Sequence, residues 1–448
     1  MAVRIRKGLD IRLKGKPEKN LISAPSTELF ALKPTDFPGL IPKLSVKVDD
    51  AVNVGSPLFF DKYRPNVKFT SPVSGKVVAI NRGERRKILE VVVKTDGRSS
   101  ALPFKKGDPG TFSREEIIAN LLSSGLWPFI RQRPFNVIAN PEDKPRDIFI
   151  SGFDSSPIAP DLNFILKDAA DSFQYGINAL ANLTEGKVYL GVKEGTLEQS
   201  IYKKINNIEI NEFSGPHPAG NVGIQIHHLN PINKGEVIWV INPQDIVNIG
   251  RLFEKGQLDP ERIIALTGSE VKNPVYYKTI LGSSVKEILE NNITGLNLRY
   301  ISGNVLTGTA ISREGFIGFY DQQITVIPEG NYHEPFGWIM PRLNKFSTSM
   351  SYFSWMMPKK EFAIDTNLNG GKRNFVITGQ YEKVLPMDIY PVELLKAILI
   401  EDFDLMENLG IYEVSEEDMA LCEFVCTSKT EVQSILRNGF DFMLKELG

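Results

Sequence analysis

The hydrophobic period of this sequence changes near residue 112, and that change constrains the fold more than any other feature. Before it, apolar and polar residues alternate over short stretches separated by turn residues, which is typical of half-buried β-strands. After it, apolar residues recur with the period of helices that pack on one face. Since the chain has 448 residues, 42% of them hydrophobic, it can bury several cores, and we expect two to four domains.

The first hundred residues predict a small β domain. Apolar and charged residues alternate from Val3 to Lys14, which predicts a strand. Further β segments follow, and Gly55 and Gly75 stand where tight turns need a positive φ. This pattern resembles the barrel-sandwich fold of lipoyl and biotinyl carrier domains. The segment expected to carry a modifiable lysine reads Phe59-Phe-Asp-Lys-Tyr-Arg-Pro, without the flanking methionines, so we expect a structural barrel without a carrier lysine.

Strands and helices alternate in the next part of the chain, which predicts a Rossmann-like α/β domain with a mainly parallel sheet. The predicted strands cover residues 135–139, 147–151, 188–192, 208–213 and 237–241. The predicted helices cover 161–183, 196–205 and 244–255, and Asp161 is the expected N-cap of the first. The sheet lacks a Gly-x-Gly-x-x-Gly or phosphate-loop sequence, so no dinucleotide fingerprint accompanies it.

A compact β unit follows, with a short helix expected over 283–291, and it resembles a soluble-ligand-binding β-grasp module. The next stretch is rich in Pro, Gly and Asn and predicts an extended connector. In the helical C-terminal part, Pro391 is expected in a first turn and Gly410 at the end of the same helix. Ser415 with Asp418, and Ser428 with Glu431, are two expected capping boxes.

These patterns predict five segments in a multidomain α/β and β fold. They are a barrel-sandwich domain (1–105), a Rossmann-like α/β domain (106–258), a β-grasp module (259–330), an extended connector (331–385) and C-terminal helices (386–448). Since the helical segment has its own capping signals, we expect it to be an appended unit whose removal leaves a folded remainder.

Composition excludes several classes of function. The 52 basic and 54 acidic residues nearly balance, so we expect no nucleic acid partner. No apolar run approaches the roughly 20 residues that span a bilayer, and the N-terminus lacks a signal peptide, so we expect a cytoplasmic chain. Cys422 and Cys426 lie four residues apart, where two buried small hydrophobes are the ordinary interpretation.

Four stretches together carry a specific resemblance: 67–77 with 82–86, 153–161, 215–223 and 371–389. Their sequences and order resemble the A-subunit family of the bacterial sodium-translocating NADH:quinone oxidoreductase. More remotely, they are similar to the electron-transfer subunit of the Rnf complex and the flavin subunit of respiratory complex I. The family resemblance covers nearly the whole chain.

The resemblance implies a peripheral subunit on the cytoplasmic side of the bacterial inner membrane. It implies a contribution to quinone binding while electrons pass from NADH to quinone and sodium is exported. Other subunits, some of them embedded in the membrane, are the implied partners, with NADH, FAD, FMN, riboflavin and iron–sulfur centres bound there. This chain alone then holds no complete active site.

Departures from the remote relatives predict that this chain binds no cofactor of its own. Their glycine-rich loop, which cradles the FMN phosphate, is replaced here by Ser124-Gly-Leu-Trp-Pro-Phe-Ile-Arg-Gln-Arg-Pro-Phe. A stretch rich in glutamate is replaced by Ser151-Gly-Phe-Asp-Ser-Ser-Pro. Only two cysteines stand where those relatives have iron–sulfur motifs, and a cluster requires four thiolates.

The altered loop supplies the candidate quinone-binding residues. Phe129 and Phe135 would pack on the quinone ring, and Arg131 and Arg133 would donate to its carbonyl oxygens. A contact with another protein of the complex explains these four residues equally well. His217, in a loop after a strand of the α/β domain, is a further candidate, although a packing role for its proline-rich loop is the simpler interpretation.

Other candidates and functions stay open. His227 and His228 are expected in an extended segment, where they point to opposite faces and cannot readily share a metal. One alternative function is an assembly scaffold of the same complex with no small-molecule site. Another is a flavoprotein that oxidises NADH, which would be yellow.

Overall fold

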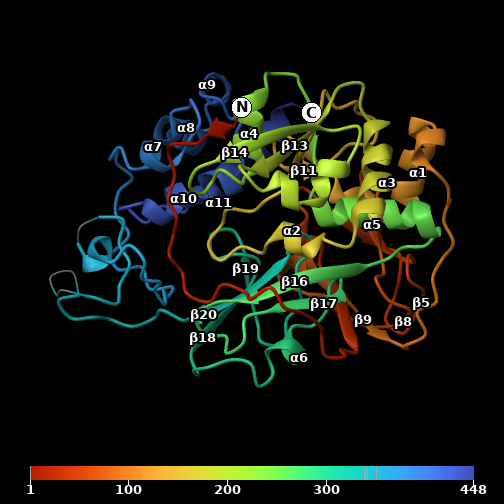
Figure 1. Ribbon diagram of the computed structural model, residues 1–448, viewed down its shortest axis with the longest axis horizontal. Helices are drawn as coiled ribbons and strands as arrows, with labels where there is room; N and C mark the ends of the chain where they lie inside the picture. Colours follow the sequence, from red (N-terminus) through yellow and green to blue (C-terminus); the bar gives the residue numbers. More distant parts are fainter. Residues whose placement is uncertain (1, 338–339, 341, 350, 448) are drawn as a thin grey trace.

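The computed structural model describes residues 2–337, 340, 342–349 and 351–447, and their strands form four sheets. Two sheets build an N-terminal barrel, one lies in an α/β domain and one in a β-grasp module, while the C-terminal part is helical. In Figure 1 the N-terminal segment (red) runs from the C-terminal helices (blue) down to the β-grasp sheet (green and teal). The connector expected at 331–385 includes the four internal positions that lie outside the described residues.

The barrel consists of a four-stranded sheet facing a three-stranded one, in the orders β3-β9-β8-β5 and β4-β6-β7. Its elements are β3 (Leu29–Leu32), η1 (Pro34–Asp36), β4 (Pro42–Leu44), β5 (Ala51–Val52), β6 (Pro57–Asp61), β7 (Lys68–Thr70), β8 (Gly75–Arg82), η2 (Glu84–Arg86) and β9 (Ile88–Thr95). Alternate residues of β8 and β9, such as Val77, Val91 and Val93, are buried between the sheets. Gly55 has a φ of +89°, which confirms the predicted turn.

The strand predicted from Val3 to Lys14 is wrong. Only β1 (Val3–Arg4) is a strand, and it pairs in parallel with β14 (Glu209–Ser214) of the α/β sheet. Beyond it the segment is irregular, because Gly8 has a φ of +142° and passes so close to His217 that a β-carbon there would lie 2.1 Å from its carbonyl oxygen. Ile5, Ile11 and Leu13 are nevertheless buried, in cores that belong to other parts of the chain, and Val3 and Leu9 are partly buried.

The α/β sheet has the order β1-β14-β13-β12-β15-β10-β11. Its first five strands run parallel, and the last two add an antiparallel edge. The further elements are η3 (Pro109–Thr111), α1 (Arg114–Ser124), η4 (Trp127–Phe129), β10 (Arg131–Arg133), β11 (Val137–Ile138), β12 (Ile148–Ser151), α2 (Leu162–Ile165), α3 (Ala170–Ala181), β13 (Val188–Lys193), η5 (Leu197–Gln199), η6 (Ile201–Lys204), α4 (Val222–Leu229), β15 (Ile238–Val240) and α5 (Pro243–Lys255). The mainly parallel sheet expected from the sequence is confirmed.

Three predicted helices of this domain need correction. The helix expected over 161–183 is two helices, α2 and α3, separated by the non-helical residues 166–169. Helix α3 packs closely on α5, where Gly250 approaches Ser172. Asp161 does cap α2, accepting a hydrogen bond from the Phe164 amide at 3.2 Å. The helix expected over 196–205 is two 3-10 segments, η5 and η6. His227 and His228 lie in helix α4, not in an extended segment.

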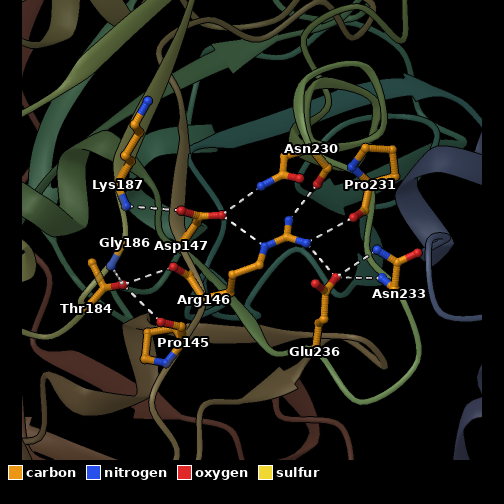
Figure 2. Close-up of polar contacts among 10 residues, drawn as sticks. All are labelled: Pro145, Arg146, Asp147, Thr184, Gly186, Lys187, Asn230, Pro231, Asn233 and Glu236. Carbon is orange, nitrogen blue, oxygen red and sulfur yellow. Dashed lines mark hydrogen bonds and ion pairs between the residues drawn. The ribbon is translucent and has the colours of Figure 1, made fainter.

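The amino ends of the central strands are held together by a network around Arg146 and Asp147 (Figure 2). The buried Asp147 carboxylate accepts hydrogen bonds from the Lys187 amide, Asn230 Nδ2 and Arg146 Nε, each at 3.0 Å. Arg146 also donates to the Asn230 and Pro231 carbonyl oxygens. These contacts join β12, β13 and the segment that leads into β15 at the amino ends of the strands. The carboxyl ends of β12 and β15 lie at the opposite end of the sheet.

The β-grasp module contains a six-stranded sheet of order β19-β18-β20-β16-β17-β2. Its elements are β2 (Leu21–Ser23), β16 (Glu261–Thr267), β17 (Tyr276–Ile280), α6 (Lys286–Leu289), β18 (Leu298–Ser302), β19 (Thr309–Ile311) and β20 (Gln323–Pro328). The helix expected over 283–291 is shorter, because only α6 is helical. Strand β2 comes from the N-terminal segment, so the sheet unites distant parts of the chain.

The C-terminal part contains η7 (Phe353–Met356), α7 (Tyr381–Val384), α8 (Pro391–Leu399), α9 (Phe403–Asn408), α10 (Glu416–Val425) and α11 (Val432–Glu446). Pro391 opens α8 as expected, but Gly410 follows the separate helix α9. The capping box of Ser415 and Asp418 is confirmed. The one expected at Ser428 is wrong, because its hydroxyl donates to the Asn374 carbonyl oxygen and α11 begins later. None of the helices in the described part of the chain has both the length and the hydrophobicity that spanning a bilayer requires.

Candidate functional site

A cleft opens at the carboxyl ends of β12 and β15. The chain runs from β12 outward to β13 and β14, then returns to the other side of β12 to form β15. The two strands therefore flank the topological switch point, where α/β sheets leave a crevice for ligands. Residues that follow β12 line one side of the crevice, and Asn242, shortly after β15, lines the other.

Two adjoining cavities make up this cleft, with volumes of about 140 Å³ and about 340 Å³. They share a wall that comes from four parts of the chain: Arg131 on β10, Asp154 after β12, Asn304 and Thr307 in the β-grasp module, and Glu417 on α10. The cleft is thus completed by the β-grasp module and the C-terminal helices. Apolar side chains of Phe153, Leu162, Val240, Ile241 and Leu306 line the smaller cavity.

Arg131 presents a guanidinium group to both cavities. Its charged group lies 5.1 Å from the centre of the Tyr320 ring, and its Nη1 donates to Asn136 Oδ1 at 3.3 Å. The Tyr320 hydroxyl in turn donates to the Pro128 carbonyl oxygen at 2.6 Å, which fixes the ring. The β-grasp module therefore orients an arginine of the α/β domain.

His217 lines the smaller cavity and is buried. Burial lowers the pKa of its imidazole to about 4, and the nearby Glu417 carboxylate opposes that shift only partly, so the ring is neutral at pH 7. Nδ1 of His217 shares a hydrogen bond with Ser155 Oγ at 3.0 Å, and the backbone amide of His217 donates to Asp10 Oδ1 at 2.9 Å. The ring is held in place by both contacts.

The other three candidates lie behind the cleft. Arg133 is 2% exposed and forms an ion pair with Glu417, Nη2 to Oε1 at 2.7 Å. Phe135 packs edge-on against Tyr412 and Phe440 of the C-terminal part, which makes it a core residue. The five sequence candidates therefore do not line one cavity, and only Arg131 and His217 meet in it.

Phe129 is also placed away from the cleft, in a buried aromatic cluster. Its ring stacks on Phe319 with the two centres 4.4 Å apart. The Arg262 guanidinium lies 5.4 Å from its centre, and Arg262 forms a fully buried ion pair with Asp245. This cluster joins the α/β domain to the β-grasp module, which accounts for Phe129 without a ligand.

Asp154 is a residue of the cleft that sequence reasoning did not single out. Its side chain is exposed to the cleft, whereas its backbone belongs to the loop that follows β12. Desolvation by the surrounding protein raises the pKa of its carboxyl group, Glu417 raises it further, and hydrogen bonds from Ser156 oppose the shift. The signal in the sequence was its place within Ser151-Gly-Phe-Asp-Ser-Ser-Pro, directly after a predicted strand.

The described residues contain no group of three His, Cys, Asp or Glu side chains that could hold a metal ion. Cys422 and Cys426 are buried free thiols. His227 Nδ1 contacts Glu413 at 2.7 Å, whereas His228 Nδ1 contacts the Ile224 carbonyl oxygen at 2.9 Å. Each of the two adjacent histidines thus has a separate structural partner.

The fold and the cleft define a class of protein: a multidomain chain in which a barrel-sandwich, a Rossmann-like sheet, a β-grasp module and C-terminal helices surround one switch-point cleft. Family models match three of these parts. Residues 3–96 match the NqrA N-terminal barrel-sandwich hybrid domain, 112–258 the NqrA second alpha/beta domain, and 263–313 the NQRA C-terminal domain.

Curated relatives match nearly the whole chain. The A subunit of the Na(+)-translocating NADH-quinone reductase of Yersinia pestis bv. Antiqua (strain Angola) is 40% identical over 441 residues, covering 97% of this chain and 98% of the relative. Its counterpart in Neisseria meningitidis serogroup B (strain ATCC BAA-335 / MC58) is 40% identical over 449 residues, covering 99% and 100%. The chain therefore belongs to the A-subunit family of the Na(+)-translocating NADH-quinone reductase, and is one of the subunits of that enzyme.

Similarity to solved structures is slight. The chain resembles an NAD+-reducing NiFe hydrogenase in its air-oxidized state with a TM-score of 0.37 and 12% identity, covering 75% of this chain and 59% of that one. The H2-reduced state gives a TM-score of 0.33 and 13% identity, covering 49% and 45%. No conclusion about the site follows from likeness at this level.

Proposed function

We propose that the switch-point cleft binds the head group of a quinone, and that the chain thereby contributes to electron transfer from NADH to quinone coupled to sodium export. One observation carries the proposal: a charged donor, Arg131, and a neutral imidazole, His217, converge in a cleft with an apolar wall. A quinone ring is apolar on its faces and accepts hydrogen bonds at its carbonyl oxygens. The cleft supplies an apolar wall for the faces of the ring, and Arg131 and His217 for its carbonyl oxygens.

Arg131 has the strongest expected role in binding. Hydrogen bonds from a charged donor are stronger than neutral ones, and negative charge grows on the quinone oxygens during reduction. Packing on the Tyr320 ring holds the guanidinium group before the ligand arrives, which lowers the entropic cost of binding. Phe129, Arg133 and Phe135 are assigned to the supporting structure.

The region aligned with the flavin loop of the remote relatives supports a chain without its own flavin. Gly125 is the C-cap of α1, and a β-carbon there would lie 2.2 Å from Thr70 Oγ1 of the barrel. Trp127 fills the following turn and donates to the Ala139 carbonyl oxygen at 2.8 Å. This loop packs against protein instead of forming a cradle of amides for a phosphate group. We place NADH, FAD, FMN, riboflavin and iron–sulfur centres in the partner subunits.

Titration of the full chain with a short-chain quinone, followed by ligand-observed NMR, tests this function. We expect saturable binding, and we expect Arg131→Ala to weaken it by about 1–3 kcal/mol, the usual cost of losing a charge-assisted hydrogen bond. The exposed Arg313→Ala is the matched control and should bind as the unsubstituted chain does. Absence of saturation, or equal affinity in the folded Arg131→Ala variant, would overturn the proposal.

A scaffold role is the second candidate, and exposed apolar residues favour it. Phe336, Leu343, Trp355 and Met356 in the connector, and Tyr390 and Ile400 in the C-terminal part, are each more than half exposed. Exposed apolar side chains of this kind suit contact with other proteins of the complex at the cytoplasmic side of the inner membrane. Titration separates the two functions, because a scaffold alone predicts no saturable quinone signal.

A further inference from the structure

Asp154 is an exposed acidic side chain that lines the cleft and is open to a ligand. It lines both cavities together with Arg131, so a molecule that reaches the guanidinium group also lies beside the carboxyl group. Its Oδ1 accepts a hydrogen bond from the Ser156 amide at 2.7 Å, which fixes the carboxyl group beyond the end of β12. Asp154 therefore has a defined position at the proposed quinone site.

Desolvation by the surrounding protein and the nearby Glu417 carboxylate raise the pKa of Asp154. Glu417 faces it from α10, and Arg133, which forms an ion pair with Glu417, is not among the residues that line the cleft. Arg131 on β10, Glu416 on α10 and Asp321 in the β-grasp module complete the charged groups of the larger cavity, and neutral His217 completes the smaller one. Glu417 forms an ion pair with Arg133 and Glu416 forms one with Arg437, and among these carboxylates it is Glu417 that raises the pKa of Asp154.

We propose that Asp154 is the proton donor to one oxygen of the quinone during its reduction, an inference that rests on the proposed quinone site. Reduction of a quinone to a quinol takes two electrons and two protons. The enzyme's oxidation of NADH supplies the electrons.

The proton passes from the Asp154 carboxyl group to the quinone oxygen. The Asp154 O–H bond breaks, its electron pair stays on the carboxylate, and a new O–H bond forms at the reduced quinone oxygen. Water reaching the cleft supplies the proton for the second oxygen and reprotonates Asp154. Arg131 stabilises the negative oxygen until it is protonated. Donors of this kind contribute about 10²–10⁴-fold to rate. The raised pKa of Asp154 means that its carboxyl group holds the proton more tightly than an ordinary aspartic acid does.

The test compares the assembled complex carrying Asp154→Asn with the unsubstituted complex. Quinone affinity of the full chain should change less than about threefold, because the amide keeps the shape of the side chain. NADH-driven quinone turnover should fall about 100-fold, while electron transfer from NADH to ferricyanide, which takes up no protons, should be unchanged. Asp168→Asn, an exposed substitution outside the cleft, is the matched control and should retain full turnover.

The pH profile separates proton donation from a merely structural role. Turnover of the unsubstituted complex should decline as pH rises through the Asp154 pKa, because only the protonated acid donates. The decline should be absent in Asp154→Asn and present, at lower turnover, in Asp154→Glu. Unchanged turnover in Asp154→Asn would overturn the inference, as would loss of quinone affinity equal to its loss of turnover. Failure of the unsubstituted chain to bind quinone would instead overturn the proposed function itself.

Discussion

At the scale of single residues, Asp36 links the barrel to the β-grasp module. It accepts a hydrogen bond from the Phe319 amide at 2.8 Å and lies 3.6 Å from Lys33 Nζ. Burial raises the pKa of its carboxyl group to about 6, and nearby Asp321 adds to the rise against the opposing effects of Lys33 and the Phe319 amide. The folded chain thus binds this proton more tightly than the unfolded chain, where the pKa is near 3.8.

The sign of the resulting pH dependence follows from that difference. As pH rises from about 4 to about 6, the contribution of Asp36 to the free energy of unfolding falls, and above that range it is a penalty. Asp36→Asn should therefore stabilise the chain at pH 7 by up to about 3 kcal/mol, at 1.36 kcal/mol for each pKa unit, and should not stabilise it at pH 4. Urea denaturation at both pH values measures this. A variant less stable than the unsubstituted chain at pH 7 would refute it.

At the scale of elements, the contact between α3 and α5, adjacent in Figure 1, depends on two glycines. A β-carbon at Gly250 would lie 1.7 Å from the Ser172 carbonyl oxygen, and one at Gly176 would lie 2.2 Å from that of Ile246. Gly250→Ala should destabilise the chain by about 1–3 kcal/mol despite the better helix propensity of alanine. Gly371→Ala, where a β-carbon meets open space, is the control. Equal urea midpoints for the two variants would contradict the close contact.

Elements whose pattern is local were predictable, and those shaped by distant contacts were not. Strand β13 and helix α5 lie close to their predicted ranges, because their apolar residues face the core of their own domain. The alternation from Val3 to Lys14 predicts one strand, yet Ile5 is buried against the C-terminal helices and Leu13 against the β-grasp module. The alternation of apolar and polar residues thus reflects contacts with two different parts of the chain.

The candidate site was predictable in part for the same reason. Arg131 and His217 could be predicted because each stands in a loop or edge that a sequence motif marked. Tyr320, Asn304 and Glu417 were missed, since they come from other domains and no local pattern records that they meet Arg131. The burial of Arg133 and Phe135 was equally hidden, because the helices that cover them follow nearly 300 residues later.

At the scale of the whole molecule, the C-terminal helices share a core with the α/β domain. Ile5, Phe135, Phe213 and Ile224 are buried in one cluster with α8, α10 and α11. The Asp418 carboxylate lies so close to Gly223, at the start of α4, that a β-carbon there would be 2.1 Å from Oδ2. The expectation that these helices are an appended unit is therefore not supported by the packing.

Removal of residues 386–448 should consequently destabilise the chain that remains. It would expose the apolar face of that shared core and leave Arg133, which is 2% exposed, without Glu417. We expect the truncated chain to aggregate or to lose cooperative thermal unfolding, as circular dichroism and size-exclusion chromatography would show. A soluble product that unfolds cooperatively would instead support the interpretation of residues 386–448 as an appended unit.

A crystal structure of the full chain soaked with a short-chain quinone would show whether the switch-point cleft holds the quinone head group. We expect the quinone ring between Arg131 and His217, with a guanidinium nitrogen within hydrogen-bonding distance of one carbonyl oxygen and the Asp154 carboxyl group at the wall of the cleft. A quinone bound elsewhere on the chain, with this cleft holding only solvent at saturating quinone, would contradict it.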